Sequence, residues 1–523
     1  MKIALAQLNY TIGDFDSNKK KIIECIGRAK SQSAQLVVFG EQAISGAPAY
    51  DLLNKVSFLD LCEDALKEIA EHCDDISVLV GLPVQIANKT VSVAALIENR
   101  KIKRYIGKET VVLRDEMCHI SPSKGCEYIK IQGTKIAVVV GDDIRTEQQY
   151  GEYADIIVNL TNNPYARGIV EKRYSFIRQL AFMTGKPIVM VNNVGGQTDI
   201  VYDGSSAIFN SRGEAVALLK SFEEDFQIVD LGGDLPPLEI PEQNKTINVY
   251  RAIKLGLRDF FEKNGFKTAC LGLSGGIDSA VVVSLAAEVL GPENVRVLLM
   301  PSQFSSDHSV EDARELAENL GVDYQIVPIN ETFAALTTTL GPVFGELPFN
   351  VAEENMQARI RSMMMMAISN KFGNILLATS NKSEIAVGYG TLYGDTVGAL
   401  SIIGDLYKSE VYDLARHINR KREIIPLNTI MKAPSAELRL EQKDSDSLPP
   451  YDILDAILYR MIEEGQSREE IINAGFDEEV VYKVYNMVVR SEFKRYQGCP
   501  TLRLSTRPLQ TGRKMPLTNK YGC

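Results

Sequence analysis

Several residue types are scarce or missing in this chain of 523 residues. It has no tryptophan, four histidines and eight scattered cysteines, and none of these cysteines shows the paired spacing of a metal site. Its apolar runs fall far short of the roughly 20 residues that a membrane-spanning helix needs. Basic residues are in deficit, with 57 Lys and Arg against 68 Asp and Glu. The resulting charge of −11 argues against nucleic acid or an anionic membrane as a partner, and we expect a cytoplasmic protein.

The length predicts at least two domains, because one domain usually holds about 100 to 200 residues. Apolar strands and amphipathic helices follow one another up to a stretch rich in glycine, proline and charge, DLGGDLPPLEIPEQNKT at residues 230–246. We therefore predict a first domain at residues 1–235, a linker at 236–246 and a second domain at 247–523. The first domain reads as layered α/β, with a hairpin that turns at Asn99-Arg100.

The second half alternates strands with helices, which predicts a doubly wound parallel sheet with its ligands at the carboxyl ends of the strands. A strand at TACLGL leads into the loop SGGIDS and then into a helix that ends at Gly291. The run RIRSMMMMAISNKFG, residues 359–373, is predicted to be a buried helix, with methionines as adaptable packing residues.

The loop at residues 273–279, LSGGIDS, carries the strongest signal. Its glycines free backbone N–H groups to surround a phosphate, and the helix that follows adds its positive end. The string resembles the signature of the ATP pyrophosphatases, which split ATP into AMP and pyrophosphate while they activate a substrate.

Later strings narrow this resemblance. LMPSQFSSDHSVEDARELAENLG, ENMQARIRSMMMM, ATSNKSEIAVGYGTLYGD and DSDSLPPYDILDAIL resemble the synthetase half of the glutamine-dependent NAD synthetases, from about residue 245 to the end. That family joins deamido-NAD to ammonia. The carboxylate attacks the α-phosphate of ATP, pyrophosphate leaves, and ammonia attacks the acyl-adenylate. The resemblance implies Mg²⁺ held by Asp278 and Glu384, and deamido-NAD held by Asn355, Arg359 and Lys494. The ATP contacts that it implies are Ser274, Gly275, Gly276, Ile277, Asp278, Ser279, Thr379, Lys408 and Ser435.

The first half resembles the amidohydrolase domain of the nitrilase superfamily, through KIALAQLNYTIGD, NLTNNPYARG and VNNVGGQTDIVYDGSSAIFN. The resemblance implies an αββα sandwich that releases ammonia from glutamine with a Glu, a Lys and a nucleophilic Cys. Glu41 and Lys108 stand at the first two positions, but the cysteine's position after the strand IAVVV holds Gly141. A glycine cannot form a thioester. We therefore expect an inactive glutaminase half and ammonia, rather than glutamine, as the nitrogen source.

Other readings stay open at this stage. Cys62 lies in a literal Cys-Glu-Asp string, but inside an amphipathic helix, where we expect a buried structural thiol. Cys118 follows Lys108 and could act as a substitute nucleophile. The first half could instead sense glutamine without cleaving it, and the acceptor could be tRNA, which the acidic charge disfavours. We expect a homo-oligomer. The tail at residues 501–523, with five basic residues and no acid, is either a flap over a phosphate-rich ligand or a disordered end.

Overall fold

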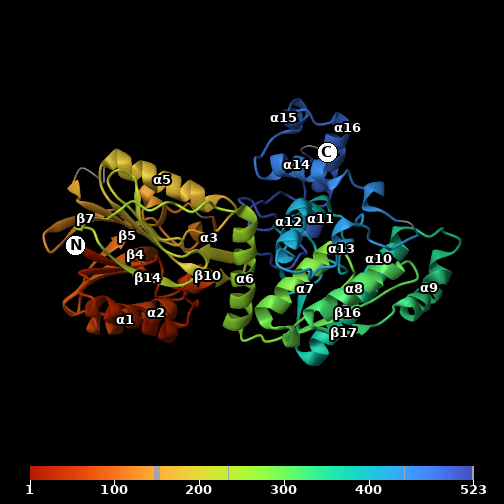
Figure 1. Ribbon diagram of the computed structural model, residues 1–523, viewed down its shortest axis with the longest axis horizontal. Helices are drawn as coiled ribbons and strands as arrows, with labels where there is room; N and C mark the ends of the chain where they lie inside the picture. Colours follow the sequence, from red (N-terminus) through yellow and green to blue (C-terminus); the bar gives the residue numbers. More distant parts are fainter. Residues whose placement is uncertain (113, 146–152, 234, 441, 521–523) are drawn as a thin grey trace. The chain divides into compact units, whose positions relative to one another are not determined.

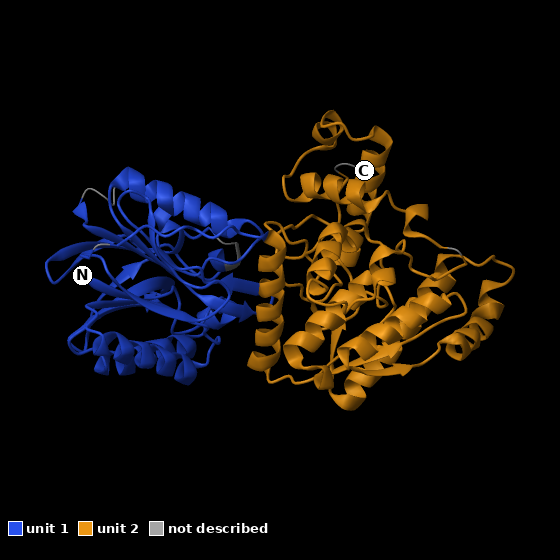
Figure 2. Cartoon of the chain, viewed as in Figure 1, with its two compact units in different colours: residues 1–244 blue, residues 245–523 orange. Residues whose placement is uncertain are grey.

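The computed structural model of the chain describes residues 1–112, 114–145, 153–233, 235–440 and 442–520. Two compact units make up the chain, unit 1 (residues 1–244) and unit 2 (residues 245–523) (Figure 2). None of the helices in the described ranges combines the length and the apolar character that crossing a bilayer requires.

Unit 1 contains two large sheets and a short hairpin. Its helices are α1 (Phe15–Ser31), α2 (Val56–Glu71), α3 (Arg114–Met117) and α5 (Ile169–Thr184). Its strands are β1 (Lys2–Gln7), β2 (Leu36–Phe39), β3 (Ser77–Ile86), β4 (Lys89–Glu98), β5 (Lys101–Gly107), β6 (Glu127–Ile131), β7 (Thr134–Val140), β8 (Ile156–Thr161), β9 (Ile188–Asn192), β10 (Val194–Gln197), β11 (Ile200–Asp203), β12 (Ala207–Phe209), β13 (Ala215–Leu218) and β14 (Asp225–Asp230).

The two sheets of unit 1 pack face to face between outer helices. One sheet has the order β14-β1-β2-β3-β4-β5 and the other the order β13-β12-β9-β8-β7-β6. Alternation along β1 shows how the layers form: Ile3 and Leu5 enter the core between the sheets, whereas Ala4 and Ala6 face the helix layer. Helices α1 and α2 cover one outer face and α5 the other (Figure 1). The predicted αββα sandwich is confirmed, and so is the hairpin of β4 and β5.

Unit 2 is built on one parallel sheet of order β17-β16-β15-β18-β19. Its strands are β15 (Ala269–Gly272), β16 (Val295–Leu299), β17 (Asp323–Ile326), β18 (Ile375–Ala378) and β19 (Leu400–Ser401). Its helices are α6 (Lys245–Asn264), α7 (Ile277–Leu290), α8 (Asp307–Leu320), α9 (Asn330–Phe344), α10 (Val351–Phe372), α11 (Lys382–Val387), α12 (Lys408–Ile418), α13 (Leu427–Met431), α14 (Tyr451–Ile462), α15 (Arg468–Asn473), α16 (Glu478–Arg490) and α17 (Glu492–Arg495). The strand order changes direction beside β15, so the loop between β15 and α7 lies at the switch point where such folds bind ligands.

The prediction that the methionine run is buried is wrong. These residues belong to α10, but only Met365 is buried, at 3% exposure, whereas Met363 and Met366 are 59% and 37% exposed. Consecutive helical residues point about 100° apart, so four in a row cannot all face one sheet. Met365 and Ile360 pack against Cys270 of β15.

The tail is ordered over its described part, which contradicts the reading as a disordered end. Thr501 pairs with Ser401 beside β19, and the backbone N–H groups of Leu504 and Ser505 donate to the Asp405 carboxylate. Arg513 donates to Glu492 of α17 at 2.7 Å. The segment is therefore fixed to unit 2 at several points.

Candidate functional site

Unit 1 contains a buried ion cluster around Gly141. The Lys108 Nζ donates to Glu41 Oε1 at 3.0 Å and to Glu116 Oε2 at 2.8 Å, and all three side chains are buried. Ser92 also donates to Glu41 Oε1, while Glu41 Oε2 has no hydrogen-bond partner among the described residues. A buried carboxylate oxygen without a partner is costly, which is typical of a site shaped for something other than stability.

Gly141 lies where a side chain would meet this cluster. The residue directly follows β7 and has a φ of +58°, a left-handed conformation that favours glycine. A Cβ at residue 141 would lie 2.8 Å from Glu41 Oε2 and 2.9 Å from Lys108 Nζ. The structure thus brings together the three positions that the sequence singled out, and the central one has no side chain.

Neighbouring residues hold this arrangement in place. Asp143 accepts hydrogen bonds from the backbone N–H groups of Glu109 and Thr110, directly after Lys108. The Asn159 side chain donates to the Gly141 carbonyl at 3.0 Å, and Asn193 donates to the Glu41 carbonyl at 2.8 Å. These hydrogen bonds fix the backbone on both sides of the cluster, at Gly141, after Lys108 and at Glu41.

The electrostatics of the cluster give a testable pH effect. Burial raises the pKa of Glu41 to about 7, although the Lys108 ammonium opposes this shift. Burial alone would lower the pKa of Lys108, but the charges of Glu41 and Glu116 outweigh it and hold that pKa above its usual range. Between pH 4.5 and 7 the folded chain thus holds a proton on Glu41 that the unfolded chain releases, so this contribution to stability is lost as pH rises through that window. We expect the melting temperature of the parent chain, minus that of Glu41→Gln, to fall from pH 5 to 7.5 in thermal melts. A difference that is constant or rises with pH would contradict the raised pKa.

The two candidate replacement thiols lie elsewhere. Cys62 is fully buried in α2, as expected for a structural thiol. Cys118 is exposed, whereas Glu41 and Lys108 are enclosed at 0% and 1% exposure. Nothing in the described contacts joins the Cys118 thiol to the ion cluster.

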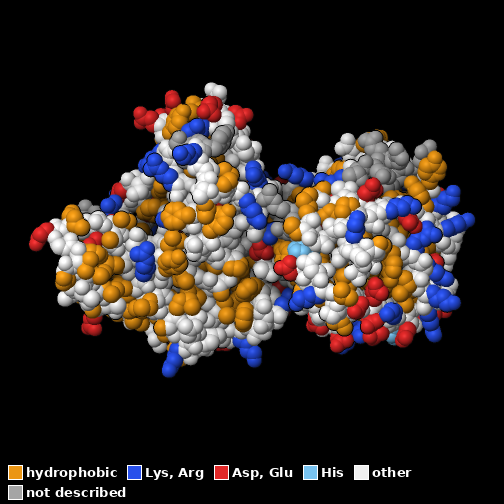
Figure 3. All heavy atoms as spheres, turned by 180° about the vertical axis from the view of Figure 1, so that it is seen from behind, with side chains coloured by type: hydrophobic (Ala, Val, Ile, Leu, Met, Phe, Trp, Pro, Cys, Tyr) orange, Lys and Arg blue, Asp and Glu red, His pale blue; other side chains and the backbone are white. Residues whose placement is uncertain are grey.

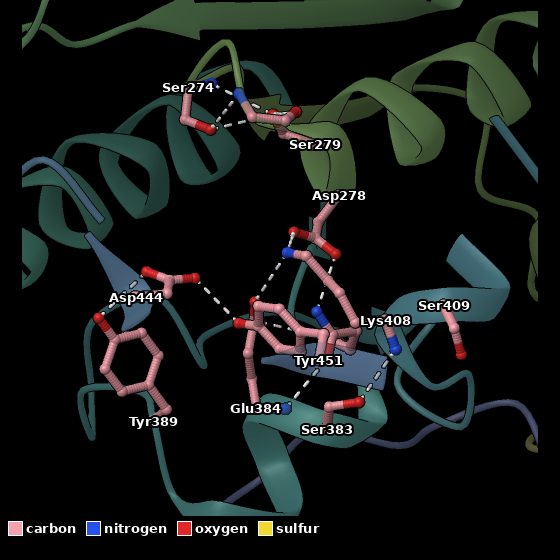
Figure 4. Close-up of polar contacts among 12 residues, drawn as sticks. Ser274, Asp278, Ser279, Ser383, Glu384, Tyr389, Lys408, Ser409, Asp444 and Tyr451 are labelled. Atoms are coloured by element: carbon pink, nitrogen blue, oxygen red, sulfur yellow. Dashed lines mark hydrogen bonds and ion pairs between the residues drawn. The ribbon is translucent and has the colours of Figure 1, made fainter. Parts of the chain in front are cut away.

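The glycine loop of unit 2 joins β15 to α7, which is the order of elements that the sequence predicts. Gly275 has a φ of +79°, and a Cβ there would lie 2.2 Å from the Ser309 carbonyl oxygen, so only glycine fits. The Ser274 hydroxyl accepts the Gly276 N–H at 3.2 Å and lies 3.1 Å from the Ser279 hydroxyl (Figure 4). Ile277, the first residue of α7, is buried and anchors the helix beneath the loop.

Below this loop two carboxylates converge on one ammonium group. The Lys408 Nζ lies 2.5 Å from Asp278 Oδ2 and 3.3 Å from Glu384 Oε1, and the three side chains point toward one another (Figure 4). Burial, and then the charge of Asp278, raises the pKa of Glu384 to about 8. The same two acids hold the pKa of Lys408 above its usual range although burial opposes them. Across the described ranges no group of three or more His, Cys, Asp or Glu side chains is arranged to hold a metal ion, so the two carboxylates stand as a pair.

The three predicted deamido-NAD residues meet at one segment, residues 388–392, directly after α11. Lys494 donates to the carbonyls of Gly388 and Gly390 at 2.8 Å, Arg359 donates to the Leu392 carbonyl, and Asn355 accepts from the Thr391 hydroxyl. A cavity beside them is lined by both Glu384 and Lys494.

Two predicted ATP contacts stand outside the ion cluster. Thr379 follows β18 at the carboxyl end of the strand and is half-buried. Ser435 lies between α13 and α14, where its hydroxyl donates to the Gln442 carbonyl.

Sequence reasoning missed several residues of these sites. Asn381 caps α11 and donates to Asp278 Oδ1 at 2.8 Å, and the Tyr451 hydroxyl donates to Asp444 while its ring faces Lys408 (Figure 4). Both lie in strings that carried the resemblance, SNKSE and DSDSLPPYD, so the strings marked the region without assigning these roles. Glu116 of the unit 1 cluster had no signal beyond lying eight residues after Lys108.

Comparison with known proteins covers both units. Residues 2–235 match the family described as Carbon-nitrogen hydrolase, and residues 249–498 match the family described as NAD synthase. A glutamine-dependent NAD(+) synthetase from Synechocystis sp. is 41% identical over 99% of each chain, and one from Thermotoga maritima is 36% identical over 100% of this chain and 99% of that one. A solved glutamine-dependent NAD+ synthetase from Acinetobacter baumannii, in complex with adenosine diphosphate, is 36% identical with a TM-score of 0.79, over 99% of this chain and 98% of that one. The chain therefore belongs to the glutamine-dependent NAD(+) synthetase family, as an ATP-using NAD synthetase with a nitrilase-like first domain.

Proposed function

We propose that this NAD synthetase amidates deamido-NAD in unit 2 and takes free ammonia as its nitrogen source. The observation that carries the second part is Gly141, which leaves Glu41 and Lys108 facing a position without a nucleophile. The domains that we assign are residues 1–235 for the degenerate glutaminase and 247–523 for the synthetase, joined by residues 236–246.

The site of unit 2 suits activation of a carboxylate by ATP. The start of α7, directly after the glycine loop, would attract the departing pyrophosphate, because a helix N-terminus attracts anions. The carboxylate of deamido-NAD, held near residues 388–392 by Asn355, Arg359 and Lys494, attacks the α-phosphate. Ammonia then attacks the resulting acyl-adenylate, and AMP leaves. Thr379, Lys408 and Ser435 complete the assigned ATP contacts.

The chemistry of the cluster fits a magnesium ion. Asp278 and Glu384 supply hard oxygen donors, and Mg²⁺ is commonly held by one or two carboxylates together with substrate phosphates. The raised pKa of Glu384 reflects two partly buried acids side by side, and the ammonium of Lys408 offsets their repulsion in part. When bound, Mg²⁺ would neutralise charge on the phosphates. Lys408 would then face both the carboxylates and the phosphate oxygens.

A second candidate is a fully glutamine-dependent enzyme, and the names of the relatives favour it, since those proteins are described as glutamine-dependent. It requires a different nucleophile, and the exposed Cys118 is the candidate thiol. In a third candidate function, unit 1 binds glutamine without hydrolysing it.

One assay separates these candidates. NAD formation from deamido-NAD and Mg-ATP is measured with ammonium or with glutamine as the only nitrogen donor. We expect turnover with ammonium and none above background with glutamine. Equal rates with both would overturn the ammonia-fed reading, and loss of glutamine use in Cys118→Ser would then identify the thiol. A thermal shift with glutamine in the absence of glutamate release would point to a binding module.

We also propose a cytoplasmic homo-oligomer that forms through unit 2. Hydrophobic side chains are spread over the surface of this unit in Figure 3. The exposed side chains of α9 and the segment that follows it include Val343 at 77% and Leu347 at 71% exposure, and α9 itself buries no residue. A large exposed apolar face is typical of an interaction surface. Sedimentation is expected to report a dimer or larger species, and Val343→Lys with Leu347→Lys to shift it toward monomer; a monomeric parent chain would contradict the proposal.

A further inference from the structure

Lys382 is a buried cation that the proposed reaction does not use. It begins α11 and is 0% exposed. Its Nζ lies 2.9 Å from Asp405 Oδ1 and 2.5 Å from Glu463 Oε1, and it donates to the Ser505 hydroxyl at 2.7 Å. A lysine is rarely fully buried unless it is paired, so this position serves a specific purpose in the fold.

On one side, this lysine and its two acids hold the C-terminal segment. Lys382 donates to the Arg507 carbonyl, and Asp405 accepts from both the backbone N–H and the hydroxyl of Ser505. Glu463 accepts the Arg507 N–H at 3.0 Å. Residues 504–507 are therefore fixed by a network with Lys382 at its centre.

On the other side, the same residue adjoins the groups assigned to ATP and magnesium. Asn381 immediately precedes it and donates to Asp278, and Glu384 follows two residues later and donates its N–H to the Asn381 side chain at 3.0 Å. The Lys382 N–H donates to the Leu406 carbonyl at 2.7 Å, two residues before Lys408. A displacement of Lys382 would thus move Asp278, Glu384 and Lys408 relative to one another.

We propose that Lys382 is a positioning residue for the synthetase reaction. It binds the C-terminal segment 504–507, and this segment acts as a brace that fixes the Asp278–Glu384–Lys408 cluster. The inference rests on the proposed role of that cluster. The brace acts through Asn381 and Glu384 and need not touch a substrate. Residues that orient ligands in this way typically change affinity or activity by about 10- to 100-fold when they are removed.

The test uses the full-length chain with three variants. Lys382→Met keeps the length of the side chain and removes its charge. Ser505→Ala removes only the hydroxyl that links Lys382 to Asp405. Ser369→Ala is the matched control, because it removes the same hydroxyl group from a serine of α10 that donates to the Asn374 carbonyl, and none of its described contacts reaches Lys382, Asp405 or Glu463.

Two readouts are needed, and one is independent of turnover. In hydrogen–deuterium exchange without substrates, Lys382→Met and Ser505→Ala are expected to speed exchange in both residues 382–387 and residues 501–507, whereas Ser369→Ala leaves residues 382–387 unchanged. In steady-state kinetics with ammonium, Lys382→Met is expected to raise the half-saturating Mg²⁺ concentration and lower kcat by about tenfold or more, with little change in the KM for deamido-NAD.

Every outcome bears on the proposal. If Lys382→Met does not fold, the comparison of Ser505→Ala with Ser369→Ala decides the question. Faster exchange of residues 382–387 in Ser505→Ala alone supports the brace, and equal behaviour of the two variants overturns it. A folded Lys382→Met with the Mg²⁺ dependence of the parent chain also overturns it. Asp278→Asn distinguishes failure of the brace from failure of the proposed magnesium role of Asp278 and Glu384. If that role is wrong, Asp278→Asn leaves the Mg²⁺ dependence unchanged.

Discussion

Asp278→Asn is expected to lower NAD synthesis from ammonium by about a hundredfold or more, the size of loss seen when one preorganised electrostatic contact to a reacting group is removed. The side chain keeps its shape but loses its charge. Lys408 then loses its 2.5 Å partner, and only Glu384 remains as an acidic ligand for the assigned cation. The loss should appear in kcat and in the Mg²⁺ dependence.

A surface acid on α12 provides the control for this prediction. Asp413→Asn makes the same chemical change on the helix that carries Lys408, but Asp413 is exposed, and its ion pair in the described part of the chain is with Arg416, three residues along. Such surface pairs contribute less than about 1 kcal/mol, so this variant should keep parental turnover. Comparable losses in both variants would remove the special role of Asp278.

Gly141→Cys is expected to give unit 1 a new capacity for glutamine hydrolysis, if the parent chain is fed by ammonia as proposed. The new Cβ would lie 2.8 Å from Glu41 Oε2, so the ends of the Glu41 and Lys108 side chains must shift to admit it, and the thiol then lies beside a carboxylate base and an ammonium group. A positioned general base contributes about 100-fold or more, so glutamate release should rise at least that far above the parental background. The substitution forces a side chain into a left-handed conformation at a cost of about 1–2 kcal/mol.

Gly141→Ala separates the thiol from that strain. It has the same φ of +58° to accommodate and the same close Cβ, but no nucleophile. We expect both variants to show a similar fall in melting temperature, and only the cysteine variant to release glutamate and to form an acyl adduct with glutamine by mass spectrometry. Hydrolysis by the alanine variant, or by the parent chain, would show that another group attacks the amide.

Local features of the fold could be predicted well because short segments determine them. Between Ala269 and Leu290 an apolar run predicts the strand, two glycines predict the loop, and apolar residues at helical spacing predict the helix. These three signals are contiguous in the chain. The prediction for the methionine run failed because all four residues are equally apolar. Composition cannot say which side of a helix packs against a neighbour, and Met363 and Met365 differ only in the direction in which they point.

The candidate sites could be predicted only where a motif marked them. Asp278 and Glu384 lie 106 positions apart in sequence, and the resemblance supplied both. Glu116 and Lys382 lie outside such reasoning. An isolated Glu or Lys usually lies on the surface. Lys382 meets Glu463 and Ser505, 81 and 123 positions away, only after the chain has folded.

The backbone conformation at residue 141 also bears on how many mutations separate this chain from one with a cysteine at that position. The backbone there is shaped by neighbouring groups. These are the end of β7 and the Asn159 side chain, which donates to the Gly141 carbonyl, so the bend does not depend on a thiol at residue 141. In the genetic code a glycine codon that ends in a pyrimidine becomes a cysteine codon through one nucleotide substitution. Under the proposed ammonia-fed function, a gain of glutamine hydrolysis is then a single mutational step from such a codon, and growth selection under scarce ammonia and plentiful glutamine should find variants at this codon first.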